Sequence, residues 1–455
     1  NLCKKLLPNI EELAKIIGLP IFDVSRMSFS RLVESYIINQ TAQHNELIPN
    51  KPNDNAMRTR RTQTYAGGFV YQPTPGLYEN VAVFDFRSLY PSIITSHNIG
   101  PESFRCSCCE GMEKVPEKPE YWFCMREKKF IPKVLEDLVV LRTKGKKEAR
   151  EAKMRGEDTT VLDARSYALK VLANAFYGYL GFFGARWYGL ECAASTTAYA
   201  RYYIKDTIQK AREKGFEVIY SDTDSCFVLL GEKTITVAKE FMQEINQDLP
   251  GQMELELEGY YPKGIFVAIK GTEKGVEKGA KKKYALLSQE GKLKVTGFEA
   301  VRRNWSLIAK EVQENVLRLV LQDKPQEAWE YVRTMIKELK LGTVPLRKLI
   351  IKTQITKELG QYTAMGPHVA AAQRMASKGE PVLPGTVVEY VIIKGSGLVR
   401  DHVRLVEEVK EGEYDAEYYL NNQIIPAVSS IFAVLGYKED EIFQETSQTG
   451  LEKWF

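Results

Sequence analysis

Short apolar runs bounded by polar turns predict strands along this chain. The runs Phe216–Ile219 and Cys226–Leu230 lie on either side of the polar segment 220–225. This arrangement predicts a β-hairpin with two carboxylates at its tip. Asp222 and Asp224 are two positions apart, so on an extended chain they point to the same side.

A second strand is predicted upstream, from Asn80 through Phe84, and it ends at Asp85. The chain then turns, and Pro91 fixes the backbone of the next segment. Such an Asp can be an ordinary helix cap, and Asp-x-Asp alone is often a turn pair. Two side-by-side carboxylates resist ionising unless a cation lies between them, and Mg²⁺ prefers oxygen ligands. The combination of both acidic segments therefore makes a candidate metal site.

Between these strands the apolar positions follow a helical period. One helix is predicted over 132–154, beginning at a proline that suits the first turn. A turn at 156–160, with a Thr cap, leads to a second helix over 162–177. That helix ends near Gly178 and Gly181, so the two helices are expected to form an antiparallel hairpin.

Polar side chains share one face on each predicted helix. Lys170, Asn174 and Tyr177 are spaced i, i+4, i+7, and Arg142 and Lys146 are four apart. Most helical Lys and Arg residues are solvated surface. Together the three cations could grip a triphosphate, with Arg142 able to do so bidentately, and the family resemblance given next implies this role rather than a solvated surface.

Three segments together resemble motifs A, B and C of the family B DNA polymerases, best those of archaeal replicative type. They are DFRSLYPSI from Asp85, K-x-x-x-N-x-x-Y-G from Lys170, and YSDTDS from Tyr220. Ser221 and Ala175 are small departures from the family pattern. The resemblance implies an α+β right-hand polymerase fold, with an antiparallel palm sheet, helical fingers and a mainly helical thumb.

The resemblance also implies a division into domains. The palm would occupy 1–105 and 189–296, the fingers 106–188, the thumb 297–447, and a sliding-clamp binding tail 448–455. The implied activity is that of a DNA-directed DNA polymerase, a nucleotidyltransferase. The primer 3′-hydroxyl would attack the α-phosphate of a dNTP, and pyrophosphate would leave.

Two metal ions about 3.5–4 Å apart assist such a transfer. Mg²⁺ is expected, with Mn²⁺ as a substitute. By the resemblance, Asp85 and Asp224 would bridge the ions, Asp222 would be a peripheral ligand, and the carbonyl of Phe86 would hold the triphosphate-side ion. Tyr90 would lie beneath the incoming sugar and exclude a 2′-hydroxyl. The implied nucleotide-binding residues are Ser88, Leu89, Tyr90, Arg142, Lys146, Lys170, Asn174 and Tyr177.

Other segments resemble the family's contacts with primer-template DNA. They are Y-x-G-G at Tyr65, K-K-x-Y near Lys281, and three elements of the thumb. Paired glycines permit close backbone approach, and cations beside an aromatic suit a phosphate backbone. A solvated charge run and a packed loop histidine are the alternatives for Lys281–Lys283 and His368. The implied DNA-binding residues are Tyr65, Gly67, Gly68, Lys281, Lys282, Lys283, Tyr284, Arg302, Arg303, Gln354, Thr356, His368 and Arg374.

Composition adds little to this picture. The chain has 455 residues, is 44% hydrophobic and has a formal net charge of +4. It is long enough for about three domains, and its overall charge only weakly indicates nucleic acid. No run of about 18 apolar residues occurs, and residues 2–17 do not form a signal peptide. We therefore expect a cytoplasmic, nucleoid-associated protein with no membrane partner.

Nothing before Asp85 resembles the exonuclease motifs of the family. We therefore expect a polymerase core without proofreading, either an excised piece or half of a divided enzyme whose partner chain bears the exonuclease. The tail 448–455 resembles a sliding-clamp (PCNA) binding box, in which three apolar side chains share a face. Folding of this tail onto the thumb is the alternative. The implied clamp-binding residues are Gln448, Leu451, Trp454 and Phe455.

Four of the seven cysteines fall together, at Cys106, Cys108, Cys109 and Cys124. Some archaeal relatives have a disulfide in this region, and Cys124 aligns with one partner. Zn²⁺ is a third alternative, although the C-x-C-C then C spacing is not a standard zinc pattern. Free thiols are the favoured expectation.

The sequence leaves two alternative functions to consider. A non-catalytic, clamp-tethered DNA-binding paralogue would be expected to lose carboxylates, yet Asp85, Asp222 and Asp224 are all present. A polymerase that uses NTPs or RNA templates is the other, and Tyr90 argues against NTPs only.

Overall fold

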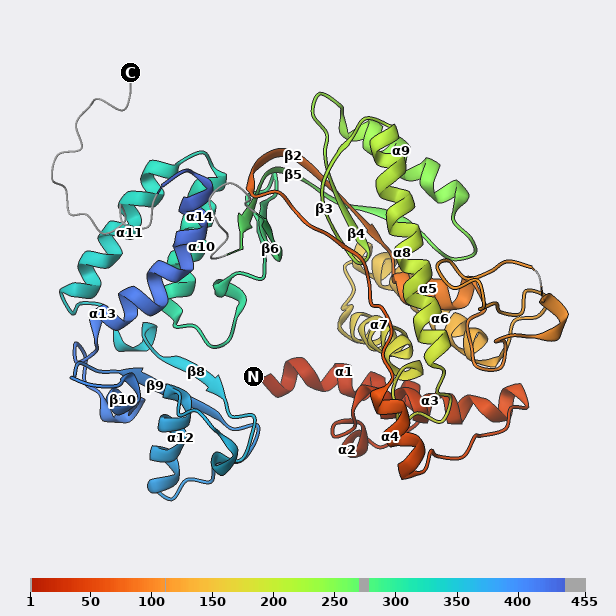
Figure 1. Ribbon diagram of the computed structural model, residues 1–455, viewed down its shortest axis with the longest axis horizontal. Helices are drawn as coiled ribbons and strands as arrows, with labels where there is room; N and C mark the ends of the chain where they lie inside the picture. The colour runs from red at the N-terminus through yellow and green to blue at the C-terminus, as the bar shows by residue number, and fades with distance from the viewer. Residues whose placement is uncertain (1, 111, 270–277, 438–455) are drawn as a thin grey trace. The chain divides into compact units, whose positions relative to one another are not determined.

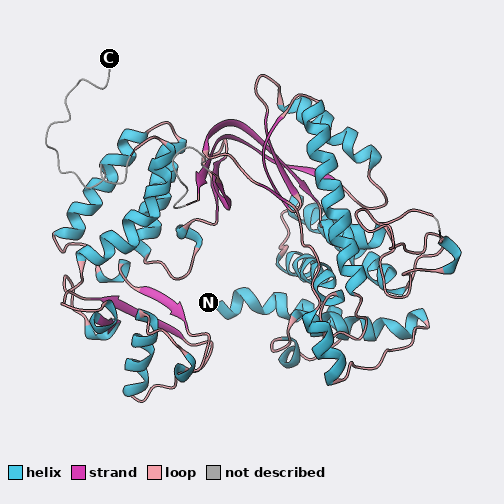
Figure 2. Cartoon of the chain, in the orientation of Figure 1, coloured by secondary structure: helices cyan, strands magenta, loops and turns pink. Residues whose placement is uncertain are grey.

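The computed structural model describes residues 2–110, 112–269 and 278–437 (Figure 1). Helices cover more of these residues than strands do (Figure 2). The chain divides into two compact units. The first comprises Asn1–Val70, Val83–Val228 and Glu232–Glu258; the second comprises Tyr71–Ala82, Leu229–Gly231 and Gly259–Phe455.

Several helices of the first unit pack around α7. This helix packs against α1, α3, α6 and α8. The pattern of buried positions along α7 explains this, because Leu169, Leu172, Ala173 and Phe176 are all buried and the opposite face is polar. The helices of this unit are α1 (Leu2–Ile17), α2 (Ile21–Val24), α3 (Phe29–His44), α4 (Asp54–Thr62), α5 (Leu89–Ser96), α6 (Phe130–Met154), α7 (Thr160–Leu180), α8 (Leu190–Glu213) and α9 (Ile235–Asp248).

The predicted helical hairpin is α6 followed by α7, and the two helices pack together (Figure 1). Its bounds differ from the prediction. α6 begins at Phe130, two residues before Pro132, which is tolerated because first-turn amides have no partner within the helix. The expected Thr cap is not made by a threonine side chain. Instead, Asp158 Oδ1 accepts the backbone N–H of Thr160 at 2.9 Å.

Short strands of the first unit place the predicted acidic positions. β3 (Glu217–Asp222) and β4 (Ser225–Leu229) form the predicted hairpin, and they lie between β1 (Val70–Tyr71) and β2 (Gly76–Phe86) in the hydrogen-bonded order. Phe84 and Phe216 both pack against Phe241 of α9, with ring centroids 5.4 and 5.5 Å apart. The acidic strand ends are therefore anchored by a buried aromatic cluster.

The second unit contains two sets of antiparallel strands, and the first strand of the first set begins in the first unit, at residues 255–258. β5 (Leu255–Ala268), β6 (Gly279–Leu287) and β7 (Leu293–Thr296) are consecutive neighbours, and Tyr284 pairs with Phe266 and with Thr296. β8 (Ile351–Gln354), β9 (Val387–Ile392) and β10 (Val403–Leu405) form a three-stranded sheet, with α12 packed against it (Figure 1). The helices of this unit are α10 (Leu307–Leu321), α11 (Pro325–Lys340), α12 (Pro367–Ser377), α13 (Ala416–Tyr419) and α14 (Ile425–Val434).

One apolar core holds the second unit together. It joins side chains of α10, α14 and both sets of strands. A π-helical turn, Leu420–Ile424, precedes α14 and carries Gln423, whose side chain accepts two hydrogen bonds from Ser306. Within the described ranges, none of the helices combines the length and apolar character that a bilayer crossing needs.

Candidate active site

The ends of β2 and of the β3–β4 hairpin bring Asp85 and Asp224 to neighbouring strands. The backbone N–H of Phe86 donates to the carbonyl of Asp224 at 2.9 Å. The next residue, Arg87, donates its backbone N–H to the carbonyl of Glu254, also at 2.9 Å. These bonds fix the two acidic positions on a rigid backbone.

The tip of the hairpin is a very tight turn. Thr223 has a φ of 59°, in the left-handed region that few residues with a β-carbon adopt. The backbone N–H of Thr223 donates to the carbonyl of Phe69, and that of Asp224 to the carbonyl of Asp222. The chain reverses between Asp222 and Asp224, so the rule that alternate residues of an extended strand point to the same side does not apply to them. Asp222 ends β3 and accepts a hydrogen bond from the Thr223 hydroxyl at 3.1 Å.

One cavity of about 410 Å³ in the first unit collects most of the predicted nucleotide residues. Its wall comes from the end of β2, the start of α5, the hairpin tip, one residue of β5, and both α6 and α7. The carboxylates come from the strands and the hairpin tip and the other cations from α6 and α7, while Arg87 adds a cation just after β2. The lining residues are Asp85, Phe86, Arg87, Ser88, Leu89, Tyr90, Pro91, Arg142, Lys146, Lys170, Asn174, Thr223, Asp224 and Glu256.

Arg142 is the buried cation of this cavity. Its side chain is 8% exposed, and one guanidinium N–H donates to the Ser88 hydroxyl at 2.6 Å. Its buried Nε has no hydrogen-bond partner among the described residues. Burial, and then the charge of Arg87, lower the Arg142 pKa. A buried donor of this kind is costly unless an acceptor is supplied, so the arrangement suits a bound anion.

Ser88 and Lys146 explain how this cation site is shaped. Ser88 adopts a left-handed backbone with φ 51°, which turns the chain from β2 into α5 and places its hydroxyl beside Arg142. Burial lowers the pKa of Lys146, and the charges of Arg142 and Arg87 lower it further. Mutual repulsion among the cations is relieved when an anion binds between them.

Tyr90 lines the cavity, and two further tyrosines support its ring from behind. Tyr90 packs on Tyr177, with ring centroids 4.3 Å apart, and the Tyr177 hydroxyl is 2.9 Å from that of Tyr65. Burial, and then the charge of Asp224, raise the Tyr90 pKa, so its ring stays neutral. A β-carbon on Gly68 would lie 3.0 Å from the Thr223 side chain and 3.3 Å from the Tyr90 hydroxyl. The glycine permits this close approach.

Sequence reasoning missed several residues at this site. Arg87 forms ion pairs with Glu254 at 2.8 Å and with Glu256 at 3.6 Å. The sequence does contain a signal for this contact, because Glu254 and Glu256 alternate with apolar residues where β5 begins and so lie on one face of the extended chain. Arg201 of α8 donates to the carbonyls of Ala66 and Gly67 and so holds the segment after Tyr65.

The three predicted metal-binding aspartates do not all line the cavity. Asp85 and Asp224 line the cavity, whereas Asp222 is not among its lining residues. Within the described ranges, the group of three or more Cys, His, Asp or Glu side chains whose ligand atoms meet is the cysteine cluster at 106–124, not the aspartates. Two carboxylates and backbone carbonyls are nonetheless a donor set that suits a hard divalent ion.

The predicted DNA-binding residues of the second unit fall into two groups. Lys281, Lys282, Arg302 and Arg303 are exposed. By contrast, the ammonium of Lys283 bonds both carboxylate oxygens of the buried Glu299, at 2.9 and 3.1 Å.

Most of the other predicted DNA-binding residues of the second unit are bonded to, or packed against, other parts of the protein. Arg374 is paired with Glu408 at 3.1 Å, and His368 packs edgewise on Tyr362. Burial lowers the pKa of His368. The Gln354 side chain donates to the carbonyl of Gly385. The backbone N–H of Thr356 donates to the Tyr362 hydroxyl, and Tyr284 is buried. The clamp-binding prediction, on Gln448, Leu451, Trp454 and Phe455, lies outside the described residues.

Comparisons with known proteins agree with this architecture. The family model described as DNA polymerase family B matches residues 21–435. A DNA polymerase of Thermococcus gorgonarius is 43% identical over all of this chain, and one of Archaeoglobus fulgidus is 34% identical over all of it. The chain therefore belongs to DNA polymerase family B, and these relatives are archaeal.

A solved structure supports the fold. The family B DNA polymerase from the hyperthermophilic archaeon Pyrobaculum calidifontis matches 96% of this chain, with a TM-score of 0.68 and 35% identity. The predicted α+β polymerase fold is thus confirmed. The chain spans 58% of the length of the Thermococcus gorgonarius relative and 55% of the Pyrobaculum calidifontis chain.

Proposed function

We propose that this chain is a DNA-templated DNA polymerase that transfers dNMP from dNTP to a primer 3′-hydroxyl. The observation that carries the proposal is the single cavity that is lined both by Asp85 and Asp224 and by Arg142, Lys146 and Lys170. Opposite charges around one open volume suit a metal-bound triphosphate better than a neutral ligand. The relatives, named as DNA polymerases, support the same activity.

The helix side of the cavity would bind the triphosphate. Arg142 offers a buried fork of donors whose Nε lacks a partner among the described residues, and its bond to Ser88 fixes the direction of that fork. Lys146 and Lys170 add charge on the same side, and Asn174 follows one turn along α7. Positioned cations of this kind stabilise charge that develops on transferring phosphoryl groups.

The aromatic side would select the sugar. Tyr90 is backed by Tyr177, which is itself held by Tyr65, so the Tyr90 ring cannot move aside easily. We propose that this ring lies beneath the deoxyribose and leaves no room for a 2′-hydroxyl. The substrates would then be dNTPs.

The strand side would hold two divalent ions, which we propose to be Mg²⁺, with Mn²⁺ as a substitute. Asp85, Asp224 and the Phe86 carbonyl would be ligands, with Asp222 peripheral. When bound, such ions activate the attacking oxygen and neutralise the leaving one. The backbone N–H of Phe86 donates to the carbonyl of Asp224, so backbone hydrogen bonding holds the two acidic positions on neighbouring segments.

Primer-template DNA would contact both units. Lys281, Lys282, Arg302 and Arg303 are exposed cations suited to phosphates. Lys283 is held by Glu299 and Arg374 by Glu408, so we propose that these two act mainly by positioning the backbone beside DNA. A sliding clamp and a separate exonuclease-bearing chain remain proposed partners from the sequence alone.

The test is primer extension by this chain with Mg²⁺, a DNA template and dNTPs, beside Asp224→Asn. Extension is expected with the intact chain and is expected to fall on the order of 10³-fold in the variant. Binding to primer-template, followed by fluorescence anisotropy, should be retained. Equal extension by both proteins would refute the assignment of Asp224. Parallel reactions with NTPs and RNA templates test the substrate assignment.

A further inference from the structure

A cysteine cluster lies outside the nucleotide cavity. Its members are Cys106, Cys108, Cys109 and Cys124, and their sulfur atoms all lie within 4.8 Å of one another. The cluster is in the loop between α5 and α6, where a 3₁₀ turn, Ser107–Cys109, carries two of the sulfurs. A β-bridge between Phe104 and Phe123 brings the two arms of the loop together. The fold thus creates a proximity that the irregular C-x-C-C spacing did not suggest.

The distances fit a tetrahedral metal ion. Cys108 Sγ is 3.7 Å from both Cys109 Sγ and Cys124 Sγ. Zinc–sulfur bonds of about 2.3 Å give tetrahedral sulfur–sulfur edges of about 3.8 Å. A disulfide needs sulfurs about 2.05 Å apart, and all these cysteines are free thiols. A polynuclear iron–sulfur cluster spreads its ligands over several irons and needs a wider cage.

The surroundings supply the groups that stabilise bound thiolates. The backbone N–H of Met125 donates to Cys109 Sγ at 3.3 Å. Cys109 and Cys124 are 1% and 2% exposed. Arg126 follows two residues after Cys124 and adds positive charge beside a four-thiolate centre, whereas Lys128 and Lys129 are already paired with Glu136 and Glu127. Donors to sulfur and a partly closed site are typical of structural zinc centres.

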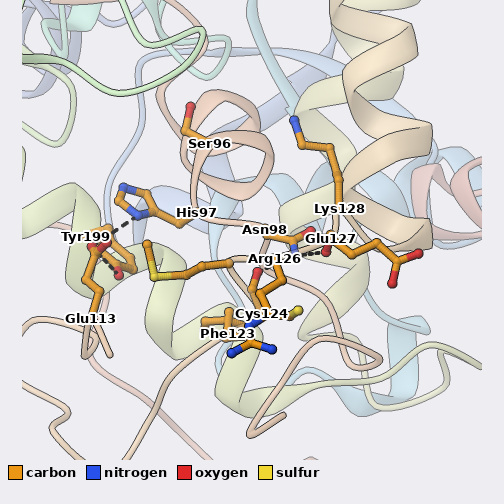
Figure 3. Close-up of a pocket in the computed structure, with 11 residues that line it drawn as sticks. Ser96, His97, Asn98, Glu113, Phe123, Cys124, Arg126, Glu127, Lys128 and Tyr199 are labelled. Carbon is orange, nitrogen blue, oxygen red and sulfur yellow. Dashed lines mark hydrogen bonds and ion pairs between the residues drawn. The ribbon is translucent and has the colours of Figure 1, made fainter. Parts of the chain in front are cut away.

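The cluster is also joined to both helices that shape the cavity. The Asn98 side chain donates to the carbonyl of Cys124 at 2.6 Å and to that of Glu127 at 2.8 Å (Figure 3). Asn98 Oδ1 accepts the backbone N–H of Lys129 at 2.9 Å. Asn98 follows α5, which carries Tyr90, and Lys129 caps α6, which carries Arg142.

We propose that these four cysteines bind one tetrahedral thiophilic divalent ion, Zn²⁺ by preference, as a structural site that fastens the α5–α6 loop. Zn²⁺ prefers four thiolates in this geometry and has no redox chemistry of its own. Binding replaces the four thiol protons, which are released to solvent. The site is separate from the nucleotide cavity and does not depend on the polymerase proposal.

The test is metal content and cobalt substitution of the full chain. Protein purified under reducing, anaerobic conditions with zinc supplied should contain one zinc per chain by elemental analysis. After zinc removal, Co²⁺ should give the visible bands of a tetrahedral site and intense sulfur-to-cobalt charge transfer, saturating at one equivalent. Cys108→Ser with Cys124→Ser should abolish both. Cys3→Ser with Cys192→Ala, which lie outside the cluster, should retain both.

Two results would overturn the proposal. One is intact chain that takes up neither zinc nor tetrahedral cobalt under these conditions. The other is stoichiometric metal that persists in the Cys108 and Cys124 double variant. The cobalt titration of the intact chain needs no variant, so it decides the question even if the double variant fails to fold.

Discussion

The nucleotide cavity and the cysteine loop lie in the same unit, but they are stabilised by different means. The cavity is framed by strands and helices, which bring Asp224 and Arg142 to the lining of one open volume. The loop has short turns and bridges, and its sulfurs converge on one point. Regular elements can hold charges ready for a ligand, whereas an irregular loop needs a cross-link or an ion to gain comparable order.

The largest expected effect is on the acidic strand ends. Asp85→Asn should lower primer extension on the order of 10³-fold, because a lining carboxylate would no longer offset charge at the reacting centre. Asp222→Asn is the matched control, since Asp222 does not line the cavity. It should cost clearly less in single-turnover rates. Equal losses would show that lining the cavity does not make Asp85 more important for primer extension than Asp222.

The next largest effect is on sugar selection. Tyr90→Ala should lower the preference for dNTP over NTP about 100-fold, because the space beneath the sugar opens. Tyr90→Phe keeps the ring stacked on Tyr177 and should retain the preference. The ratio of kcat/KM values for dATP and ATP measures this directly. An unchanged ratio in Tyr90→Ala would remove this residue from sugar recognition.

A smaller effect is expected at the buried arginine. Arg142→Lys should raise the KM for dNTP about 30-fold, since it keeps a charge but loses the fork and the bond to Ser88, worth about 2 kcal/mol. Arg150→Ala, an exposed position on the same helix, is the control and should leave the KM unchanged. Comparable effects of both variants would indicate a general electrostatic contribution only.

Substitutions in the cysteine loop should lower the stability of the protein more than its rate of catalysis. Cys108→Ser with Cys124→Ser should lower the melting temperature by several degrees, as loss of a structural ion exceeds about 1 kcal/mol. The kcat at low temperature should change less than tenfold, because no cysteine lines the cavity. A loss of activity as large as that of Asp85→Asn would show that catalysis in the cavity depends on the cysteine loop.

The smallest effect concerns pH. Burial lowers the pKa of Lys146 from 10.5, so its charge is lost at a lower pH than that of a free lysine. As pH rises through this lowered pKa, the KM for dNTP should rise a few-fold. Lys146→Arg should flatten the profile. In the same window the unfolded chain binds more protons, so stability should rise with pH while affinity falls.

Local patterns predicted much of the fold. The acidic hairpin, the strand that ends at Asp85 and the helical pair were all expected from periodicity and turn residues. Some helix bounds differ from the prediction. The expected start of α6 was Pro132, but the helix begins at Phe130, since a proline anywhere in the first turn costs no hydrogen bond. The rule for an extended strand does not apply to Asp222 and Asp224, because Thr223 between them adopts a left-handed backbone and donates its N–H to the carbonyl of Phe69.

The sequence by itself determined the chemistry available, namely carboxylates at strand ends, cations along helix faces and four neighbouring thiols. Only the tertiary structure decided which of these groups meet. Arg142 reaches Ser88 across 54 positions, and Arg87 reaches Glu254 across 167. Sequence periodicity reports the face of one element at a time. Contacts between distant elements depend on how whole helices and strands pack, which no local pattern encodes.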